Sequence, residues 1–217
     1  MLYIVATPIG NLQDITLRAL EVLKNADVIA CEDTRHTRVL LDRYQIKKPL
    51  ISYHSYSKAD KSDHILDLLR RGKDVALVSD SGTPGISDPG AHLIAAAQDA
   101  GIPVTAAPGP AALVVGLILS GLPTDKFAFE GFLPVKTGAR ERRLRELLGL
   151  GRTIIVYESP HRLVRLLEQI AQIEPGRVIA CARELTKKFE EIKRGKACDL
   201  LAYFRTQRPR GEFMVIF

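Results

Sequence analysis

Residues 75–101 read VALVSDSGTPGISDPGAHLIAAAQDAG and hold one complete strand, loop and helix. The apolar run Val75–Ser79 predicts a buried strand, and the alanine-rich run Ala91–Ala100 predicts a helix that ends at Gly101. The connection Ser79–Gly90 is rich in glycine, proline and small polar residues and is long for a strand-to-helix turn. Long connections of this kind are often functional, so this stretch predicts a site as well as a fold.

The same alternation of apolar runs and helical patterns extends in both directions from this stretch. Further strands are expected at 2–6, 28–31, 50–53 and 103–107. Helices are expected between them, the first with Asp14 as its N-cap. Strands that alternate with helices predict a mostly parallel sheet covered on both faces.

The regular alternation of strands and helices ends at the turn-like segment 122–125. Strands are expected at 127–132, 153–157, 177–182 and 213–217, a hairpin arm at 189–195, and helices at 140–148, 160–170 and 198–204. We therefore expect an α/β fold made of two α/β domains, residues 1–121 and 122–217, with a ligand cleft between them.

The positive charge of the chain is concentrated in its second half. The formal net charge is +6 over 217 residues. Residues 1–121 hold 12 Lys and Arg against 13 Asp and Glu, whereas residues 122–217 hold 19 against 12. A basic half beside a nearly neutral half indicates that a polyanion docks on one side. An exposed basic surface without a partner is the alternative.

Cysteine and histidine spacing argues against metal and disulfide chemistry. The three cysteines (Cys31, Cys181 and Cys198) are far apart with no CxxC, and no two histidines form an HxxxH pair. We expect no metal site and a reducing, cytoplasmic environment. The apolar stretch 102–123 is interrupted by prolines, which favours a short strand and a buried helix over a membrane span.

Three loops that follow expected strands are candidates for ligand contacts, because ligands bind at the carboxyl ends of strands in α/β sheets. They are residues 7–12, 79–90 and 107–112. None is a GxGxxG fingerprint, so a dinucleotide is poorly supported. Asp80 is expected to contact the ligand, and Asp88 to cap the next helix. Simple turns and tight packing are the alternative for each loop.

The second half carries a denser set of polar residues. Segments 158–162 and 183–188 each follow an expected strand. A basic helix and its flanks are the best candidate for phosphate binding; their cations are Lys136, Arg140, Arg142, Arg143, Arg145 and Arg152. A solvated basic face is the alternative.

Taken in order, these segments resemble one family from Met1 to Phe217. The motifs are ATPIGNL (6–12), DITLRAL (14–20), EDTR (32–35), 79–90, PGP (108–110), SGLP (120–123), GFLP (131–134), ESPHR (158–162) and RELTKK (183–188). They resemble the ribosomal RNA small subunit methyltransferase I family of the tetrapyrrole methylase superfamily. Each motif alone is weak, whereas the ordered set is highly specific.

The resemblance implies a cofactor, a substrate and a set of contacts. It implies a cytoplasmic homodimer that holds S-adenosylmethionine in the cleft and methylates the ribose 2′-oxygen of a cytidine in small-subunit (16S) ribosomal RNA. The implied cofactor contacts are Pro8, Ile9, Gly10, Asp80, Gly82, Thr83, Pro108, Gly109, Ala111, Ala112 and Tyr157. The superfamily often has serine at the position of Ala111, so only backbone contacts are expected there. Many members continue past the last strand, whereas this sequence stops at Phe217.

A ribose hydroxyl needs a base, because it is a poor nucleophile until it loses its proton. Lys187 is the first candidate, provided that its basic neighbours and partial burial lower its pKa. Glu158 and Glu184 are the alternatives. The expected RNA contacts are Arg35, Arg140, Arg142, Arg143, Arg162, Arg183 and Lys188.

Two rival functions stay open at this point. A methylase of a small tetrapyrrole-like metabolite would leave the basic half unexplained. A non-enzymatic RNA-binding factor would leave the polar loops of the neutral half without a purpose.

Overall fold

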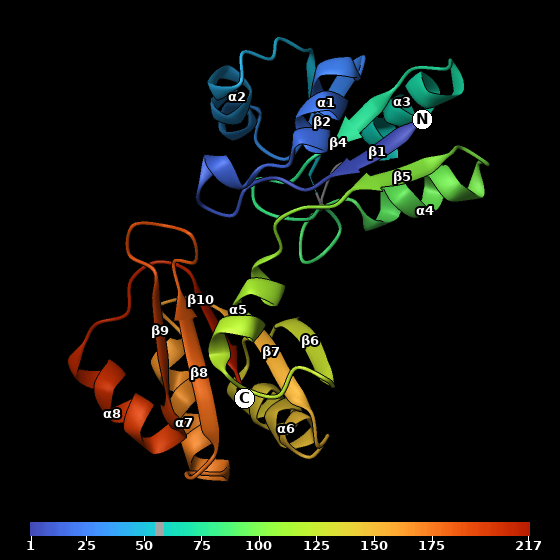
Figure 1. Ribbon diagram of the computed structural model, residues 1–217. Coiled ribbons are helices and arrows are strands. Elements are labelled where there is room, and N and C mark those ends of the chain that lie inside the picture. Colours follow the sequence, from blue (N-terminus) through green and yellow to red (C-terminus); the bar gives the residue numbers. More distant parts are fainter. Residues whose placement is uncertain (55–58) are drawn as a thin grey trace. The chain divides into compact units, whose positions relative to one another are not determined.

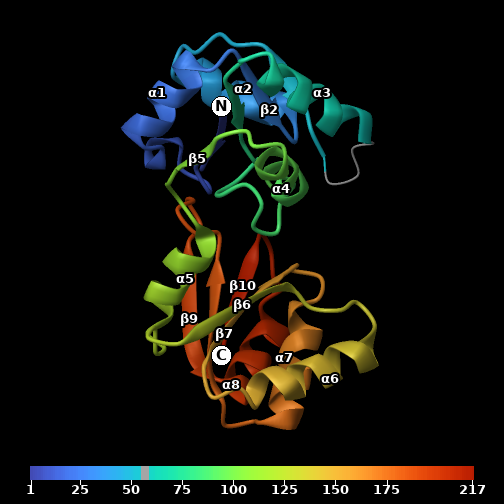
Figure 2. The same ribbon diagram turned by 90° about the vertical axis from the view of Figure 1, so that its right-hand side faces the viewer.

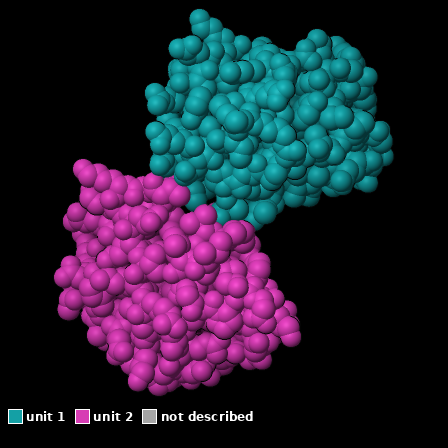
Figure 3. Space-filling model, viewed as in Figure 1, with its two compact units in different colours: residues 1–111 teal, residues 112–217 magenta. Residues whose placement is uncertain are grey.

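The computed structural model describes residues 1–54 and 59–217 (Figure 1). Contacts divide the chain into two compact units, residues 1–111 (unit 1) and 112–217 (unit 2), coloured separately in Figure 3. Each unit has its own sheet and its own apolar core, which confirms the predicted fold class of two α/β domains. Among the helices in these ranges, none combines the length and the apolar character that a membrane span requires.

Unit 1 is built on a five-stranded parallel sheet. The strands are β1 (Leu2–Val5), β2 (Val28–Cys31), β3 (Leu50–Ser52), β4 (Val75–Leu77) and β5 (Val104–Ala107). Their order across the sheet is β3-β2-β4-β1-β5, and every pair is parallel. The helices of the unit are η1 (Leu12–Asp14), α1 (Leu17–Asn25), α2 (Thr34–Arg43), α3 (Ala59–Arg70) and α4 (Ala91–Asp99).

Helices cover both faces of this sheet, as predicted. Alternate residues of a strand point to opposite faces, so Ile4 and Val5 belong to two different apolar clusters. One cluster includes Leu23 of α1 and Leu41 of α2, and the other includes Ile65 of α3. The strands therefore read as continuous apolar runs because both of their faces are buried.

The first helix begins two residues later than the sequence predicted. Asp14 ends the short helix η1 instead of capping α1. The N-cap of α1 is Thr16, whose side chain accepts a hydrogen bond from the backbone N–H of Ala19 at 3.1 Å. The prediction was wrong because the turn Leu12–Asp14, capped by Asn11, intervenes between strand and helix.

Unit 2 contains a mixed sheet of five strands. They are β6 (Phe127–Phe132), β7 (Thr153–Glu158), β8 (Val178–Arg183), β9 (Glu191–Lys196) and β10 (Phe213–Ile216), in the order β6-β7-β10-β8-β9. Strands β6 and β7 are parallel, and the other pairs are antiparallel. The chain thus ends on a central strand, which pairs with β7 and β8.

Four helices accompany this sheet: α5 (Ala112–Ser120), α6 (Thr137–Leu148), α7 (Leu163–Ile173) and α8 (Ala197–Thr206). Helices α6, α7 and α8 share one apolar cluster with alternate strand residues such as Val156 and Val215. Helix α5 packs on β8 and β10 (Figure 2). Unit 2 is therefore also covered on both faces.

The boundary between the two units lies ten residues before the expected one, at 111/112 instead of 121/122. The difference is helix α5, which the sequence assigned to the first domain. Gly116 of α5 lies so close to β10 that a Cβ atom there would be 2.9 Å from the sulfur of Met214. This close approach attaches α5 to the sheet of unit 2.

We expect Gly116→Val to destabilise unit 2 by about 1–3 kcal/mol, because the added methyl groups overpack a buried contact. Gly138→Val is the matched control, since Gly138 also lies in a helix and a Cβ there would meet no atom within 4 Å. Urea denaturation followed by circular dichroism measures both. Equal losses in the two variants would show that helix propensity, and not the contact with Met214, sets the effect.

Candidate functional site

The three candidate loops of unit 1 contact one another at the carboxyl edge of the sheet. The N–H of Thr7 donates to the carbonyl of Gly82 at 2.8 Å, and the N–H of Gly82 donates to the carbonyl of Thr7 at 3.1 Å. The hydroxyl of Thr83 donates to the carbonyl of Pro110 at 3.3 Å. Segments up to a hundred residues apart thus form one assembly, here called the loop cluster (residues 7–12, 79–90 and 107–111).

Gly82 is the residue that holds the first two loops together. Its φ of +80° lies in the left-handed region that favours glycine. A Cβ atom there would also lie 3.3 Å from Cγ2 of Ile9. The carbonyl of Gly82 also accepts a hydrogen bond from the hydroxyl of Ser79 at 3.2 Å. Both the N–H and the carbonyl of Gly82 are thus hydrogen-bonded.

The implied cofactor contacts fall mostly in the loop cluster. Within it, Pro8, Ile9 and Gly82 are buried, Thr83 and Ala111 are half-buried, and Gly10, Pro108 and Gly109 are exposed. Ala112 is the first residue of α5 in unit 2. Tyr157 lies on β7 of unit 2, with its ring centroid 4.9 Å from that of Phe129 and 5.8 Å from that of Phe132.

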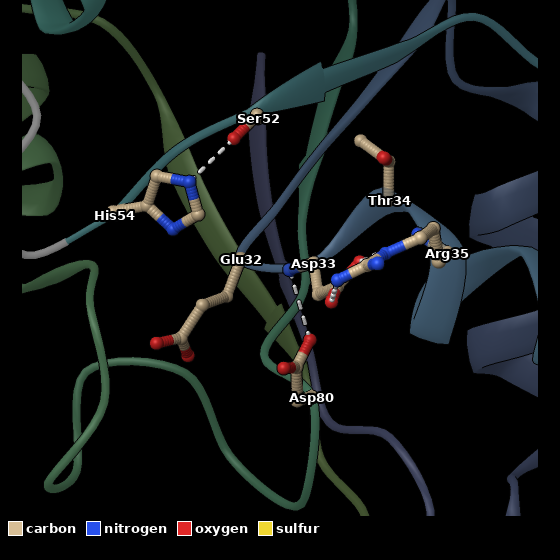
Figure 4. A pocket seen from close by; sticks show the side chains of 7 residues that line it. All are labelled: Glu32, Asp33, Thr34, Arg35, Ser52, His54 and Asp80. Atoms are coloured by element: carbon tan, nitrogen blue, oxygen red, sulfur yellow. Dashed lines mark hydrogen bonds and ion pairs between the residues drawn. The ribbon is translucent and has the colours of Figure 1, made fainter.

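Beside the loop cluster, unit 1 has a polar pocket of about 430 Å³. Its lining comes from the ends of β2, β3 and β4: Glu32, Asp33, Thr34, Arg35, Ser52, His54 and Asp80 (Figure 4). The Asp80 carboxylate accepts a hydrogen bond from the N–H of Asp33 at 3.1 Å, which ties the end of β4 to the end of β2. Across the pocket, Ser52 Oγ lies 2.7 Å from Nε2 of His54.

The carboxylates of the pocket differ in what they contact. Asp33 accepts hydrogen bonds from the side chain and backbone of Arg35, which hold its pKa at about 2. The Glu32 carboxylate has no hydrogen-bond partner in residues 1–54 and 59–217, and Figure 4 shows it directed into the hollow. Burial, followed by the charge of Asp80, raises the pKa of Glu32. A half-buried, unpartnered carboxylate is a typical mark of a functional site.

Asp88 lies near this pocket and does not cap α4, so that prediction was wrong. The N-cap of α4 is Gly90, and no side chain caps the helix. Burial and the charge of Glu32 raise the pKa of Asp88 to about 6. Asp88 is therefore part of the electrostatics of the pocket.

We expect Asp88→Asn to stabilise unit 1 above pH 6. The pKa of Asp88 is raised from 3.8 to about 6, so the folded chain binds more protons than the unfolded chain between these values. Stability therefore falls as the pH rises through this window and stays lower above it. With a discount for solvent screening, the gain at pH 8 is about 1 kcal/mol, and it disappears below pH 4. Urea denaturation at both pH values measures it, with the exposed Asp63→Asn as control.

In unit 2, the sheet edge at the ends of β7 and β8 carries the other candidate residues. The ammonium of Lys187 lies 2.8 Å from the Glu212 carboxylate and 3.2 Å from that of Glu184. Burial alone would lower the pKa of Lys187, but these two hydrogen bonds outweigh it and the pKa is raised. The condition for Lys187 as a base, a lowered pKa, is thus contradicted, because its nearest charges are carboxylates and not the basic neighbours in sequence.

The two alternative bases, Glu184 and Glu158, also hold the fold. Glu184 accepts hydrogen bonds from the N–H of Glu212 at 2.9 Å and from Lys187. Burial would raise the pKa of Glu184, but these bonds lower it. Glu158 is fully buried, and burial raises its pKa. The N–H of Ser159 donates to it at 2.8 Å, and Arg162 Nε lies 3.1 Å away.

Several expected RNA contacts are occupied within unit 2. Arg140 is only 3% exposed and donates to the side chain of Gln169, so a phosphate cannot reach it. Arg143 binds both oxygens of Glu130 at 2.6 and 2.9 Å and also pairs with Glu146. Arg162 donates to the carbonyl of Leu133 at 2.8 Å. Two cations of the basic helix, Arg140 and Arg143, are therefore held by other side chains of unit 2.

The other expected RNA contacts have different surroundings. Arg35 is exposed at the rim of the pocket of unit 1 and pairs with Asp33 at 2.9 Å. Arg183 donates to the carbonyl of Arg210 at 2.6 Å. Arg142 and Lys188 are exposed and have no ion pair with any residue that the structure describes.

Comparison with known proteins identifies the family. Residues 1–201 match the family model described as Tetrapyrrole (Corrin/Porphyrin) Methylases. The chain belongs to this family. Within it, the methylase is 49% identical over 217 residues to "Ribosomal RNA small subunit methyltransferase I" of Synechocystis sp., covering all of this chain and 78% of that protein. It is 46% identical to the protein of the same name from Thermotoga maritima, covering 99% of this chain and 96% of that protein. The family expected from the sequence is confirmed.

The fold of the methylase is found in solved structures of more distant proteins. It superposes on uroporphyrin-III C-methyl transferase from Thermus thermophilus, complexed with S-adenyl homocysteine, with a TM-score of 0.69 and 19% identity. The match covers 99% of this chain and 96% of that one. At this identity the likeness concerns the fold alone. Among the described residues of the methylase, no three or more His, Cys, Asp or Glu side chains form a group able to hold a metal ion.

Sequence reasoning missed five residues of the pocket of this methylase: Glu32, Asp33, Thr34, Ser52 and His54. The segment Glu32–Arg35 was noted only as a motif. Its position directly after a predicted strand, the same signal that identified Asp80, could have marked it as part of the site. Nothing local marks Ser52 and His54, because their role depends on β3 lying next to β2.

Proposed function

We propose that this methylase transfers the methyl group of S-adenosylmethionine to the ribose 2′-hydroxyl of a cytidine in 16S ribosomal RNA. The proposal includes action in the cytoplasm, as a homodimer, on the small ribosomal subunit. It rests on the relatives from Synechocystis sp. and Thermotoga maritima, whose name states the substrate and which are similar along the whole chain. The basic excess of residues 122–217 supports a polyanionic substrate.

One observation supports a transfer site in unit 1. The sheet order β3-β2-β4-β1-β5 divides its carboxyl edge at β4. The loop cluster follows β4, β1 and β5, whereas the pocket follows β3, β2 and β4. Asp80, at the end of β4, belongs to both. A cofactor held by the loop cluster would therefore lie beside a substrate held in the pocket, and such proximity supplies much of the rate of a group transfer.

The cofactor contacts that we propose are the members of the loop cluster. Pro8, Ile9 and Gly10 come from the first loop, Asp80, Gly82 and Thr83 from the second, and Pro108, Gly109 and Ala111 from the third. Exposed backbone N–H groups in such glycine-rich loops suit a carboxylate.

We propose Glu32 as the base in place of Lys187. The cofactor supplies a methyl group activated on sulfur. The Glu32 carboxylate would take the proton of the ribose 2′-hydroxyl, and the 2′-oxygen would then accept the methyl group that the bound cofactor supplies. Glu32 suits this role because its carboxylate has no hydrogen-bond partner in the described ranges and because burial and the charge of Asp80 raise its pKa, against the opposing effect of His54. Ser52 and His54, which lie 2.7 Å apart through Oγ and Nε2, line the same pocket.

Methyl transfer from labelled S-adenosylmethionine to small ribosomal subunits that lack their native 2′-O-methyl marks tests the proposal. The expected result is a single labelled ribose, located by mass spectrometry. Cofactor binding without transfer to these subunits would contradict it. Transfer to a tetrapyrrole precursor under the same conditions would instead identify a small-molecule methylase.

A further inference from the structure

The loop between β8 and β9 (residues 184–190, here called the hairpin loop) is unusually well fixed for an exposed connection. Two of its residues, Glu184 and Thr186, have positive φ angles of +49° and +65°. Non-glycine residues in this region are uncommon and persist only when their surroundings fix them. Backbone positions of this kind cluster at functional sites.

Hydrogen bonds hold both ends of the hairpin loop. The Glu184 carboxylate and N–H both bond to the backbone of Glu212, and Lys187 bridges the two carboxylates. The N–H of Thr186 donates to the Glu190 carboxylate at 2.6 Å. Lys187 is thus held in two ion pairs within unit 2. The side chains of the next two residues, Lys188 and Phe189, have no hydrogen bond or ion pair with any described residue.

The tip of the hairpin loop presents a cation beside an aromatic ring. Phe189 is 63% exposed, and the ammonium of Lys188 lies 5.7 Å from the centre of its ring. Lys188 has no ion pair in the described ranges. The neighbouring segment before β10 adds Arg208 and Arg210, which are exposed and have no side-chain ion pair with any described residue.

We infer that the hairpin loop binds single-stranded RNA, with an unpaired base stacked on Phe189 and the adjoining phosphates held by Lys188, Arg208 and Arg210. A ring and a cation fixed side by side match the two chemical parts of an unstacked nucleotide. Charge complementarity favours this partner, since Lys188 lies beside the ring and the segment before β10, which is bonded to the start of the hairpin loop, adds two exposed cations, whereas Arg140 and Arg143 of α6 are occupied. The inference rests on the proposed function and adds the form of RNA that is bound and the residues that bind it.

Two substitutions separate the parts of this contact. Phe189→Leu keeps an apolar side chain but removes the stacking surface, and Lys188→Gln removes one charge. The matched controls are Phe127→Leu and Lys126→Gln, which change an exposed ring and an exposed cation where β6 begins, at the opposite edge of the same sheet. Phe189→Tyr should retain the wild-type affinity.

Binding to a fluorescent single-stranded RNA of mixed sequence, and to the same strand without bases, is the test. We expect Phe189→Leu to weaken binding to the complete strand about tenfold and to leave binding to the abasic strand unchanged. Lys188→Gln should lower the slope of log affinity against log salt by about 0.7 for both strands. With ribosomal subunits as substrate, Phe189→Leu should raise KM and leave kcat and cofactor affinity unchanged.

The inference would be overturned if the wild type and Phe189→Leu each bound the abasic strand as tightly as the complete strand. This holds even if the enzyme still methylates ribosomal subunits. A change in molecular mass in solution caused by Phe189→Leu would also overturn it, since the ring would then belong to a contact between copies of the chain. If the wild type transfers no methyl group, that result contradicts the proposed function. Strand binding is a separate measurement and tests the inference alone.

Discussion

Glu32→Gln is expected to lower the single-turnover rate of methyl transfer by about 10²- to 10⁴-fold, the range typical of a lost general base. Glutamine keeps the size of the side chain and its hydrogen bonding to a ribose but cannot accept the proton. Affinity for the cofactor should stay close to that of the wild type, because Glu32 lies in the pocket and outside the loop cluster. Rapid mixing of enzyme, cofactor and substrate subunits measures the rate, with Glu21→Gln on the exposed face of α1 as control.

The pH dependence of the same rate distinguishes a base from a binding contact. Glu32 must be deprotonated to act, so the wild-type rate should rise with pH through the pKa of Glu32. Burial and the charge of Asp80 raise this pKa above its ordinary value of 4.5, which moves the rise toward neutral pH. In Glu32→Gln the rise should be absent. A variant that is slow but keeps the rise would assign the proton to another group.

Arg162→Met is expected to destabilise unit 2 by about 3–5 kcal/mol at pH 7, the cost typical of leaving a buried charge without its partner. Arg162 Nε lies 3.1 Å from the Glu158 carboxylate, which is fully buried, and the other carboxylate oxygen has no partner within the described ranges. The substitution also removes the hydrogen bond from Arg162 to the carbonyl of Leu133. Urea denaturation measures the loss.

A double variant separates the loss of the charge pair from the loss of packing. Glu158→Gln combined with Arg162→Met removes both charges, so it should recover part of the stability lost in the single variant. Arg145→Met breaks an exposed pair with Glu141 and should cost less than 1 kcal/mol. If Arg162→Met keeps wild-type stability and instead loses affinity for RNA, Arg162 contacts the substrate as its sequence position suggested.

These contacts divide the polar residues of unit 2 into two groups. Lys187, Glu184 and Glu158 are held by internal charges, and their surroundings explain them as parts of the fold. Lys188 and Phe189, which directly follow Lys187 in sequence, have exposed side chains at the loop tip. Neighbouring residues therefore differ in exposure and in partners, which a motif alone does not show.

The sequence by itself determined the class of fold, the positions of the strands and the family. Apolar runs such as Val28–Cys31 could be predicted as strands, because a strand that is buried on both faces needs an apolar residue at every position. The loop cluster was predictable for the same reason, since every strand of a parallel sheet delivers its following loop to one edge. Helix α5 was assigned to the wrong side of the boundary because its uniformly apolar surface fits either unit, and its packing on β8 and β10, with Gly116 against Met214, decides between them.

Only the tertiary structure decided which polar residues are available for chemistry. Glu32 and His54 share a pocket because β2 and β3 are neighbours in the sheet, and Lys187 is held in its charged form by Glu212, 25 residues away. The pKa and the availability of a charged side chain depend on the charges and burial within a few ångströms of it. Those neighbours come from strands and loops distant in sequence, and for this reason the role of each ionisable residue followed from the folded chain.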